Sequence, residues 1–373
     1  MTSRERVLLA LSHKQPDHVP ISIGTTIVDG FTRLAKENFE DYLSLPREEC
    51  ALTHKPMGTI ATPHNILARY PADFTTVRLK APWNNPTTVF PDGSYLDDYG
   101  CTMSPCEYYY DCTVRSLPGQ ITDDDIENCT WPDPYASGRA DGLRNEAISL
   151  RQTTKKALVA DIMCGGPFEQ ALWVRGWEDF LCDMYVNPAL AERLLDKITE
   201  VDIGLWDVLL TAVGDQVDIV CQGDDLAMQT GPILSPELYQ KIVFKYHKRL
   251  YDFIKSKTAA KIFHHSCGSV YRLIPGLIEA GVDILNPIQT SAADMEPERL
   301  KREFGGTIAF WGGFDTQKIL PFGTPREITD EVKRLMEILG KDGGYIFSPG
   351  HNIQPLVPPE NMRVMFDAAF FYR

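Results

Sequence analysis

The sequence predicts a (β/α)8 barrel, or TIM barrel, with an inserted β-hairpin and loop region in its N-terminal third. From about residue 157 onward, short apolar runs rich in β-branched residues alternate with longer helical runs. Strands that alternate with helices in this way form parallel sheets with crossover helices. An earlier strand-like run at 19–23 fits a closed barrel. The alternative, an open doubly wound sheet that binds a dinucleotide, lacks its G-x-G-x-x-G fingerprint.

The predicted strands are apolar runs that end in Gly, Asp, His or Asn. They span 157–164, 217–222, 260–265, 282–287, 307–311 and 344–348. The predicted helices that connect or follow them span 176–184, 187–213, 236–257, 270–280, 296–304, 325–340 and 359–371. Ser235-Pro236-Glu237 places a cap, a first-turn proline and a first-turn acid in order, which indicates a helix start. Gly281 and Gly340 stand where helix C-terminal glycines belong.

The stretch 84–150 differs from the rest of the chain in composition, because it is rich in Pro, Asp, Gly and Tyr. Asp92-Gly93 is a hairpin turn signal, and aromatic residues are too frequent for a disordered linker. We therefore predict a hairpin and loop insertion beside the barrel mouth, within a single domain that covers residues 1–373. Its Tyr108–Tyr110 run would either line an aromatic pocket or form the surface of the hairpin.

Composition excludes several functional classes. The net charge of −14 and the pI of about 5.1 disfavour binding to phosphate backbones or anionic lipids. No apolar run is long enough to span a membrane, and residues 1–11 lack the features of a signal peptide. The nine cysteines are odd in number and scattered, as in reduced proteins. We expect a cytoplasmic protein without nucleic-acid or membrane partners, and the oligomeric state stays open.

Reactive side chains follow nearly every predicted strand. The active site of a TIM barrel lies at the C-terminal ends of its strands, so these residues are candidates for function. In chain order they are Glu169; Asp224, Asp225 and Gln229; His265 and Cys267; Asn286 and Gln289; Asp315; and His351 and Asn352. A solvated pair that caps a helix is the alternative for Asp224 and Asp225.

The His265-Ser266-Cys267 run is the sharpest local signal. Residues i and i+2 of an extended strand project to the same side, so both side chains could bind one metal ion. Imidazole with thiolate is a typical zinc donor set. The alternative is a buried histidine beside a small apolar cysteine. His264 should point to the opposite side and is assigned a structural role. The spacing of Cys101, Cys106 and Cys112 fits no common metal motif, so buried or loop thiols are expected there.

Several motifs together resemble the uroporphyrinogen decarboxylase superfamily. They are residues 4–20, Gly165-Gly-Pro-Phe-Glu169, Asp224-Asp225-Leu226 with Gln229, Ser235-Pro-Glu-Leu-Tyr239, Gly312-Gly-Phe-Asp315 and Gly350-His-Asn-Ile353. The resemblance covers nearly the whole chain. The decarboxylase itself carries an arginine-rich segment after the first strand, which binds substrate carboxylates. Here residues 22–30 contain no arginine, and Asp73, which could match the decarboxylase's acidic motif, has no arginine partner in the sequence pattern.

His265-Ser-Cys-Gly268 and Gly281-Val-Asp-Ile-Leu-Asn-Pro287 look like the corrinoid-methyltransferase branch of that superfamily. Those enzymes bind zinc through His-x-Cys and a later cysteine, and this chain has His351 at the later position. The resemblance therefore implies a zinc-dependent methyltransferase that works with a corrinoid protein and a small methylated substrate. Zinc ligands would be His265, Cys267 and His351.

Further roles follow from the same resemblance and from the positions after the strands. Glu169, Asp225 and His351 would be catalytic. Substrate contacts would come from Asp224, Gln229, Asn286, Gln289, Asp315 and Asn352. Decarboxylation of a porphyrinogen in tetrapyrrole biosynthesis is the second interpretation, and a non-catalytic binding barrel is the third.

Overall fold

A curled sheet of seven parallel strands forms the centre of the computed structural model, which describes residues 1–84, 87–163 and 165–373. The strand order is β15-β14-β13-β12-β9-β8-β4. The bounds are β4 (Phe74–Val77), β8 (Ala157–Met163), β9 (Ile219–Gly223), β12 (Lys261–His265), β13 (Ile284–Asn286), β14 (Ala309–Phe314) and β15 (Tyr345–Pro349). All six strands predicted from the alternation are present, and β4 was not predicted. Cys164, at the end of one predicted strand, lies outside the described residues.

The segment around Ile21 occupies the eighth position and closes the barrel. Ile21 forms a parallel bridge with Phe347 of β15, and the Ser22 amide donates to the Phe347 carbonyl over 2.9 Å. On the other side, the Asp73 amide donates to the Ile21 carbonyl over 3.0 Å at the start of β4. The predicted early strand at 19–23 is therefore present as a short extended connection, and the TIM-barrel prediction is confirmed.

Alternation along the strands divides the core into two layers. Phe263, Trp311 and Phe74 belong to a cluster inside the barrel, where Trp311 contacts the other two rings at centroid distances of 5.1 and 4.6 Å. Their neighbours Ile262 and Phe310 belong to the outer cluster between strands and helices. Successive side chains of a strand point to opposite faces, and in a barrel the faces are the interior and the helical shell. The same alternation sends His265 inward and His264 outward.

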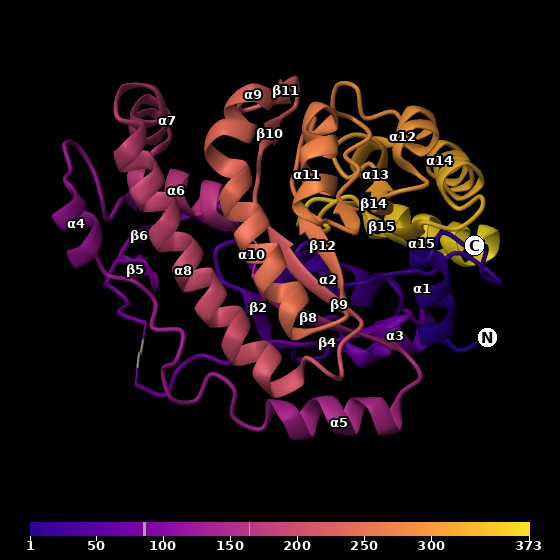
Figure 1. Cartoon of the computed structure of the whole chain (residues 1–373). Coiled ribbons are helices and arrows are strands. Elements are labelled where there is room, and N and C mark those ends of the chain that lie inside the picture. The colour runs from indigo at the N-terminus through magenta and orange to yellow at the C-terminus, as the bar shows by residue number, and fades with distance from the viewer. Residues whose placement is uncertain (85–86, 164) are drawn as a thin grey trace.

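Helices cover the outside of the sheet, and α8 and α10 run side by side across it (Figure 1). The predicted helix at 236–257 is present but divided into α9 (Pro236–Leu238), a π-helical turn (Tyr239–Val243) and α10 (Phe244–Lys257). The predicted helix at 270–280 begins with a 3-10 turn (Tyr271–Leu273) before α11. The other helices of this half are α6 (Pro167–Arg175), α7 (Trp177–Val186), α8 (Pro188–Val213), α11 (Ile274–Ala280), α12 (Pro297–Phe304), α13 (Ile319–Phe322), α14 (Pro325–Leu339) and α15 (Pro359–Tyr372).

The N-terminal half adds two small antiparallel sheets. One has the order β1-β3-β2 and the other β5-β6-β7, which contains the predicted hairpin. Their strands are β1 (Phe31–Thr32), β2 (Leu52–His54), β3 (Thr59–Ile60), β5 (Tyr95–Leu96), β6 (Thr102–Cys106) and β7 (Tyr109–Val114). A further strand pair joins β10 (Ala227–Met228) to β11 (Gly231–Pro232). The helices here are α1 (Ser3–Leu11), α2 (Arg33–Tyr42), α3 (His64–Arg69), α4 (Asp123–Asn128) and α5 (Leu143–Thr153).

The two small sheets contact each other and the barrel. The Tyr110 amide donates to the Pro56 carbonyl over 2.9 Å, and Lys55 Nζ lies 3.6 Å from the centre of the Tyr95 ring. Tyr109 Oη donates to Gln354 Oε1 in the loop after β15. The inserted hairpin therefore lies beside the barrel mouth.

Asp73 has an arginine partner after all. It lies at the start of β4, where Arg6 Nη1 donates to its Oδ1 over 2.7 Å and the Ile21 amide donates to its Oδ2. The sequence pattern did not indicate this partner, because Arg6 comes from α1, far away in sequence. The start of β4 is the end of the barrel opposite the mouth, so this ion pair joins α1 to the barrel.

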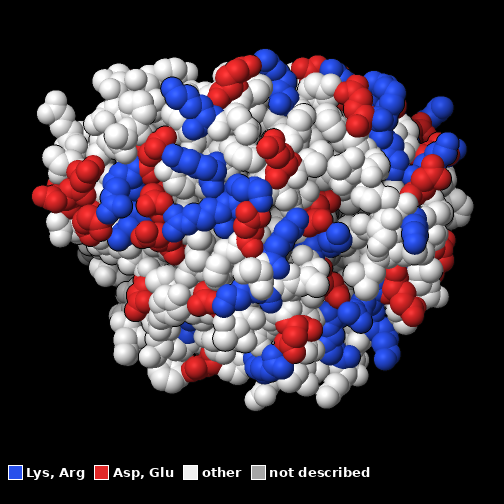
Figure 2. All heavy atoms as spheres, in the orientation of Figure 1, with Lys and Arg blue, Asp and Glu red and all other residues white. Residues whose placement is uncertain are grey.

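Charged side chains of both signs are interspersed on the face that Figure 2 shows. Between α8 and α10, for example, Arg249 Nη1 lies 2.5 Å from Asp196 Oδ1. Within the described part of the chain, no helix is both long enough and apolar enough to cross a membrane.

Candidate metal centre at the barrel mouth

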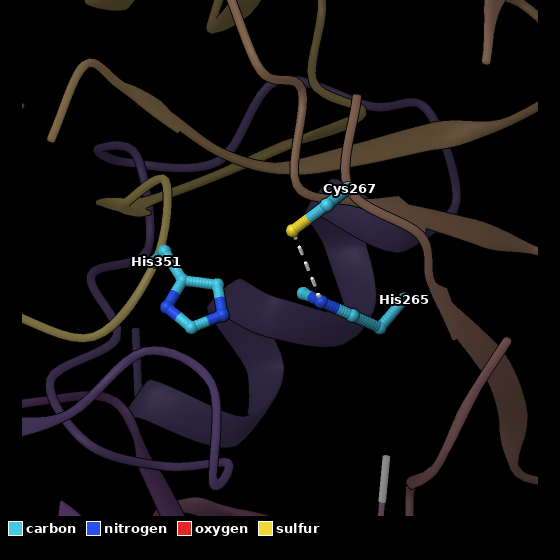
Figure 3. Close-up of side chains that lie close together, drawn as sticks. All are labelled: His265, Cys267 and His351. Atoms are coloured by element: carbon cyan, nitrogen blue, oxygen red, sulfur yellow. Dashed lines mark hydrogen bonds between the residues drawn. The ribbon is translucent and has the colours of Figure 1, made fainter. Parts of the chain in front are cut away.

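His265, Cys267 and His351 converge at the mouth of the barrel (Figure 3). His265 ends β12, Cys267 follows two residues later, and His351 lies in the loop after β15. One ligand atom from each residue lies within 4.8 Å of the other two. Cys267 Sγ is 3.5 Å from His265 Nε2, and the two imidazole centroids are 5.8 Å apart. These side chains form a group that could hold a metal ion.

Asn286 fixes the orientation of His265. The Asn286 side-chain amide donates from Nδ2 to the Trp311 carbonyl over 3.1 Å, so its Oδ1 accepts from His265 Nδ1 over 2.6 Å. With the proton on Nδ1, the lone pair of His265 Nε2 faces Cys267. Histidine ligands of metals commonly donate their second ring N–H to such an acceptor.

The backbone after β12 turns sharply to present Cys267. Gly268 has a φ of +85°, and a Cβ there would lie 2.7 Å from the Met228 carbonyl oxygen. Because both the conformation and the space exclude a side chain, glycine is required at this position. The Cys267 amide donates to Asp225 Oδ1 and the Gly268 amide donates to Gln289 Oε1, each over 2.7 Å.

Two carboxyl groups stand beside the three donors. Asp225 Oδ1 lies 3.8 Å from His265 Nε2, and the Asp225 amide donates to Glu169 Oε2 over 3.3 Å. Burial, followed by the charges of Asp225 and Asp224, raises the pKa of Glu169 to about 8. Burial also raises the pKa of Asp225, and burial together with the charges of Asp225 and Glu169 raises the pKa of the Cys267 thiol well above its usual range. With a pKa of about 8, the Glu169 carboxyl retains its proton at neutral pH, and burial also favours the neutral forms of Asp225 and Cys267.

Asp224 has a different environment from Asp225. Its carboxylate is fully buried and accepts from the amides of Phe168 and Glu169 at the start of α6, over 2.9 and 2.5 Å. It also lies 2.7 Å from His247 Nε2. Asp224 therefore caps the helix that carries Glu169, as the alternative interpretation had it, but in a buried position rather than a solvated one.

A cavity of about 270 Å³ opens beside the three donors. Its lining includes the predicted site residues Gln229, Cys267, Gln289, Asp315 and His351. Asp315 also accepts from the Gln317 amide over 2.7 Å. The predicted substrate contacts of these residues stay predictions.

Asn352 and Asn286 lie deeper than the cavity. Asn352 is buried, donates to the Ile27 carbonyl over 2.8 Å and accepts from the Gly30 amide over 2.9 Å. Asn352 thereby joins the loop after β15 to the segment 22–30, which contains no arginine. The contacts seen for both asparagines are with protein groups, and their predicted substrate contacts stay predictions.

His54 is a neighbour of this group that the sequence analysis did not identify. It ends β2, and its buried Nδ1 has no hydrogen-bond partner among the described residues. Burial lowers the pKa of His54 to about 4. Burial, then the proximity of His265 and His54, lowers the pKa of His351 to about 3. Because β2 lies outside the barrel strands, only the tertiary fold brings His54 here, and no local pattern could have indicated it.

The remaining cysteine candidates lie elsewhere. Cys101 and Cys112 are buried, and each Sγ lies 3.9 Å from the Trp173 carbonyl oxygen. Cys106 is exposed at the end of β6. The expectation of buried or loop thiols agrees with these positions.

Comparison with known proteins identifies relatives. A uroporphyrinogen decarboxylase of Ruthia magnifica is 25% identical over 191 residues, which cover 49% of this chain and 50% of that protein. One from Trichlorobacter lovleyi is 27% identical over 254 residues, 65% of this chain and 68% of that protein. The chain thus spans about half the length of the first relative and about two thirds of the second.

A solved methyltransferase from Methanosarcina mazei matches the fold over 100% of both chains, with a TM-score of 0.67 at 18% identity. At this identity the likeness shows the fold. The family model for uroporphyrinogen decarboxylase (URO-D) matches residues 99–370, well over half of the sequence. The superfamily resemblance is confirmed, and the chain belongs to the uroporphyrinogen decarboxylase family.

Proposed function

We propose that this protein is a zinc-dependent methyltransferase that moves a methyl group between a small methylated substrate and a corrinoid protein. The observation that carries the proposal is the convergence of His265, Cys267 and His351 within 4.8 Å at the barrel mouth. The fold-level likeness to a methyltransferase adds support.

The donor set fits zinc in both chemistry and spacing. Two imidazoles and one thiolate are common zinc ligands, and a tetrahedral ion with ordinary bond lengths separates nitrogen from sulfur by about 3.6 Å. The observed separation between Cys267 Sγ and His265 Nε2 is 3.5 Å. A zinc ion held there would act as a Lewis acid on the atom that loses the methyl group. One thiolate leaves such an ion more electrophilic than two would.

Glu169 is suited to hold the proton that the leaving atom needs. Its pKa of about 8 keeps the carboxyl protonated at neutral pH, and its contact with the Asp225 amide keeps it at the mouth. Asp225 is placed either to complete the metal coordination or to share that proton. In both cases the Cys267 amide fixes the position of Asp225 Oδ1.

Decarboxylation of a porphyrinogen is the second candidate, because the curated relatives bear that name. A substrate with many carboxylates needs cationic partners, usually arginine. Residues 22–30 contain no arginine, and no lysine or arginine is among the described residues that line the cavity. This disfavours the second candidate.

The test combines metal analysis with methyl transfer. We expect about one zinc per chain, and methylation of reduced free cobalamin from a panel of O-, N- and S-methyl donors, read from the visible spectrum. Cys267→Ala should lose both zinc and transfer, whereas the exposed-cysteine control Cys106→Ala should keep both. Full transfer with unchanged zinc in Cys267→Ala would refute the assignment, and a zinc-free active decarboxylase would replace it.

A further inference from the structure

Two cysteines of the inserted hairpin lie side by side at the end of α6. Cys101 directly precedes β6 and Cys112 belongs to β7, and both are buried. Met103 pairs with Cys112 across the hairpin, and Cys101 lies two residues before Met103, so all three side chains share one face of the hairpin. Each of the two Sγ atoms lies 3.9 Å from the Trp173 carbonyl oxygen. The two thiols therefore meet at a single point of the buried face.

The two thiols differ in reactivity. Their mutual hydrogen bond is the largest influence on both, and it lowers the pKa of Cys101 and raises the pKa of Cys112. Arg115 adds a positive charge, because its Nη1 donates to the same Trp173 carbonyl over 3.0 Å. The thiolate is the reactive form of cysteine, and a neighbouring donor or cation favours it. Cys101 is therefore the thiol suited to act as nucleophile, and Cys112 is placed to react with it afterwards.

A second cavity brings small molecules close to this pair. It has a volume of about 300 Å³, and its lining includes Ser116 and Cys129. Cys101 Sγ lies 3.7 Å from Ser116 Oγ, so the Ser116 side chain stands between the thiol and the cavity. Cys112 keeps 8% of its surface exposed. A molecule as small as hydrogen peroxide thus has a short path to the two sulfurs, whereas another protein does not.

We propose that Cys101 and Cys112 form a reversible disulfide when a hydroperoxide oxidises the protein. The Cys101 thiolate attacks one peroxide oxygen, the O–O bond breaks, and the sulfur becomes a sulfenic acid while the other oxygen leaves as water after taking up a proton. The Cys112 sulfur then attacks the Cys101 sulfur, the S–S bond forms, and a second water leaves. Two thiols and one hydrogen peroxide give one disulfide and two waters. A dithiol reverses the reaction by thiol–disulfide exchange.

The position of this bond links it to the barrel mouth. Trp173, whose carbonyl both thiols contact, donates from its indole Nε1 to Glu169 Oε1 over 3.4 Å. Disulfide formation removes both S–H donors from that carbonyl, one helical turn from Glu169. The three candidate metal ligands take no part in the reaction. The inference goes beyond the proposed function and does not depend on it, because thiols and peroxide alone carry the chemistry.

Peptide mapping in a Cys106→Ser background tests the bond. Cys106 is exposed and stands between the two cysteines, and once it is replaced, chymotryptic cleavage at Tyr108–Tyr110 leaves Cys101 and Cys112 on separate peptides. The zinc-loaded protein is treated with hydrogen peroxide, free thiols are blocked with N-ethylmaleimide, and the peptides are compared by mass before and after dithiothreitol. We expect most chains to contain a Cys101–Cys112 link that dithiothreitol breaks. No link, or a link from either cysteine to Cys129, would overturn the proposal.

Single variants separate the two steps. In Cys112→Ser a hydroxyl can still donate to the Cys101 thiolate but cannot close the bond, so the sulfenic acid should persist on Cys101 and react with dimedone. In Cys101→Ser we expect at least about tenfold less dimedone on Cys112, because its thiol is the less acidic one. Cys182→Ser removes an exposed cysteine of α7 and should form the link as the wild type does.

Equal labelling of the two remaining thiols in these variants would overturn the assignment of Cys101 as the nucleophile. The mapping in Cys106→Ser leaves the buried pair intact, so the test of the disulfide itself does not depend on whether Cys101→Ser or Cys112→Ser folds normally. Methyl transfer is not needed as a readout in either experiment. The disulfide and the proposed function can therefore fail independently.

Discussion

His264 and His265 are adjacent in sequence and have opposite environments. His265 points into the barrel, where Asn286 holds one ring nitrogen and the other faces Cys267. His264 points into the helical shell, where its Nδ1 lies 2.5 Å from Tyr251 Oη and its ring lies 5.5 Å from that of His247. Burial lowers the pKa of His264 well below its usual range. One step along a strand thus separates a histidine beside a thiol at the barrel mouth from one enclosed in the helical shell.

The neighbouring acids repeat this contrast. Asp224 is buried, and its carboxylate accepts from two amides and contacts His247. Asp225 is partly exposed at the mouth and contacts the Cys267 amide. The comparison teaches that residue type does not distinguish structure from function here. What differs is the surroundings of the side chain: His264 and Asp224 are enclosed between the strands and the helices, whereas their neighbours lie beside Cys267 at the barrel mouth.

The largest expected effect separates the two histidines. His265→Ala should lower zinc affinity at least about a hundredfold, because a ligand is lost. His264→Ala should keep one zinc per chain but lower the free energy of unfolding by about 2–4 kcal/mol, because it leaves a cavity and an unpaired Tyr251 hydroxyl. Elemental analysis and urea unfolding with a chelator present measure the two effects. If His264→Ala lost zinc while its free energy of unfolding stayed normal, the assignment of His264 as structural and of His265 as the metal ligand would be contradicted.

The sequence could predict the parts of the site that one strand or one loop supplies. His265 and Cys267 follow from alternation at the end of a recognisable strand, and His351 follows from its position after another. The short β4 was not predicted, because its four residues stand among loops and the strand with which it pairs, β8, comes much later in the chain. His54 and the Arg6–Asp73 ion pair depend on contacts between distant segments, which local patterns do not encode.

A second test sharpens the contrast between the acids. Asp224→Asn should lower the free energy of unfolding by about 3 kcal/mol, because the buried carboxylate accepts several hydrogen bonds that an amide cannot all replace. Asp225→Asn should change stability by less than about 1 kcal/mol and weaken zinc binding about tenfold instead. Urea unfolding and zinc competition with a chelator measure both variants. The reverse pattern would show that Asp224, rather than Asp225, belongs to the functional site.

The smallest expected effect concerns Asp202 of α8, which is buried in the helical shell near Asp224. Unlike Asp224, it is buried with an oxygen, Oδ2, that has no hydrogen-bond partner among the described residues. Burial, then the charge of Asp224, raises its pKa well above the usual range, and the buried hydroxyls of Tyr99 and Tyr251 lie near its charge. The folded protein thus keeps a proton here that the unfolded chain releases above about pH 4. This group therefore lowers stability progressively as pH rises above that value.

Asp202→Asn removes the ionisable group and should remove this part of the pH dependence. We expect the stability difference between the variant and the wild type to shift in favour of the variant by at least about 1 kcal/mol between pH 5 and pH 8. Urea unfolding at the two pH values measures the difference in the free energy of unfolding. The other buried acids contribute equally to both proteins, so their contributions cancel in this difference. A constant difference between the two proteins at both pH values would mean that Asp202 ionises normally in the fold. The helical shell around Asp202 would then hold an ionised carboxylate without a hydrogen-bond partner at little cost in the free energy of unfolding.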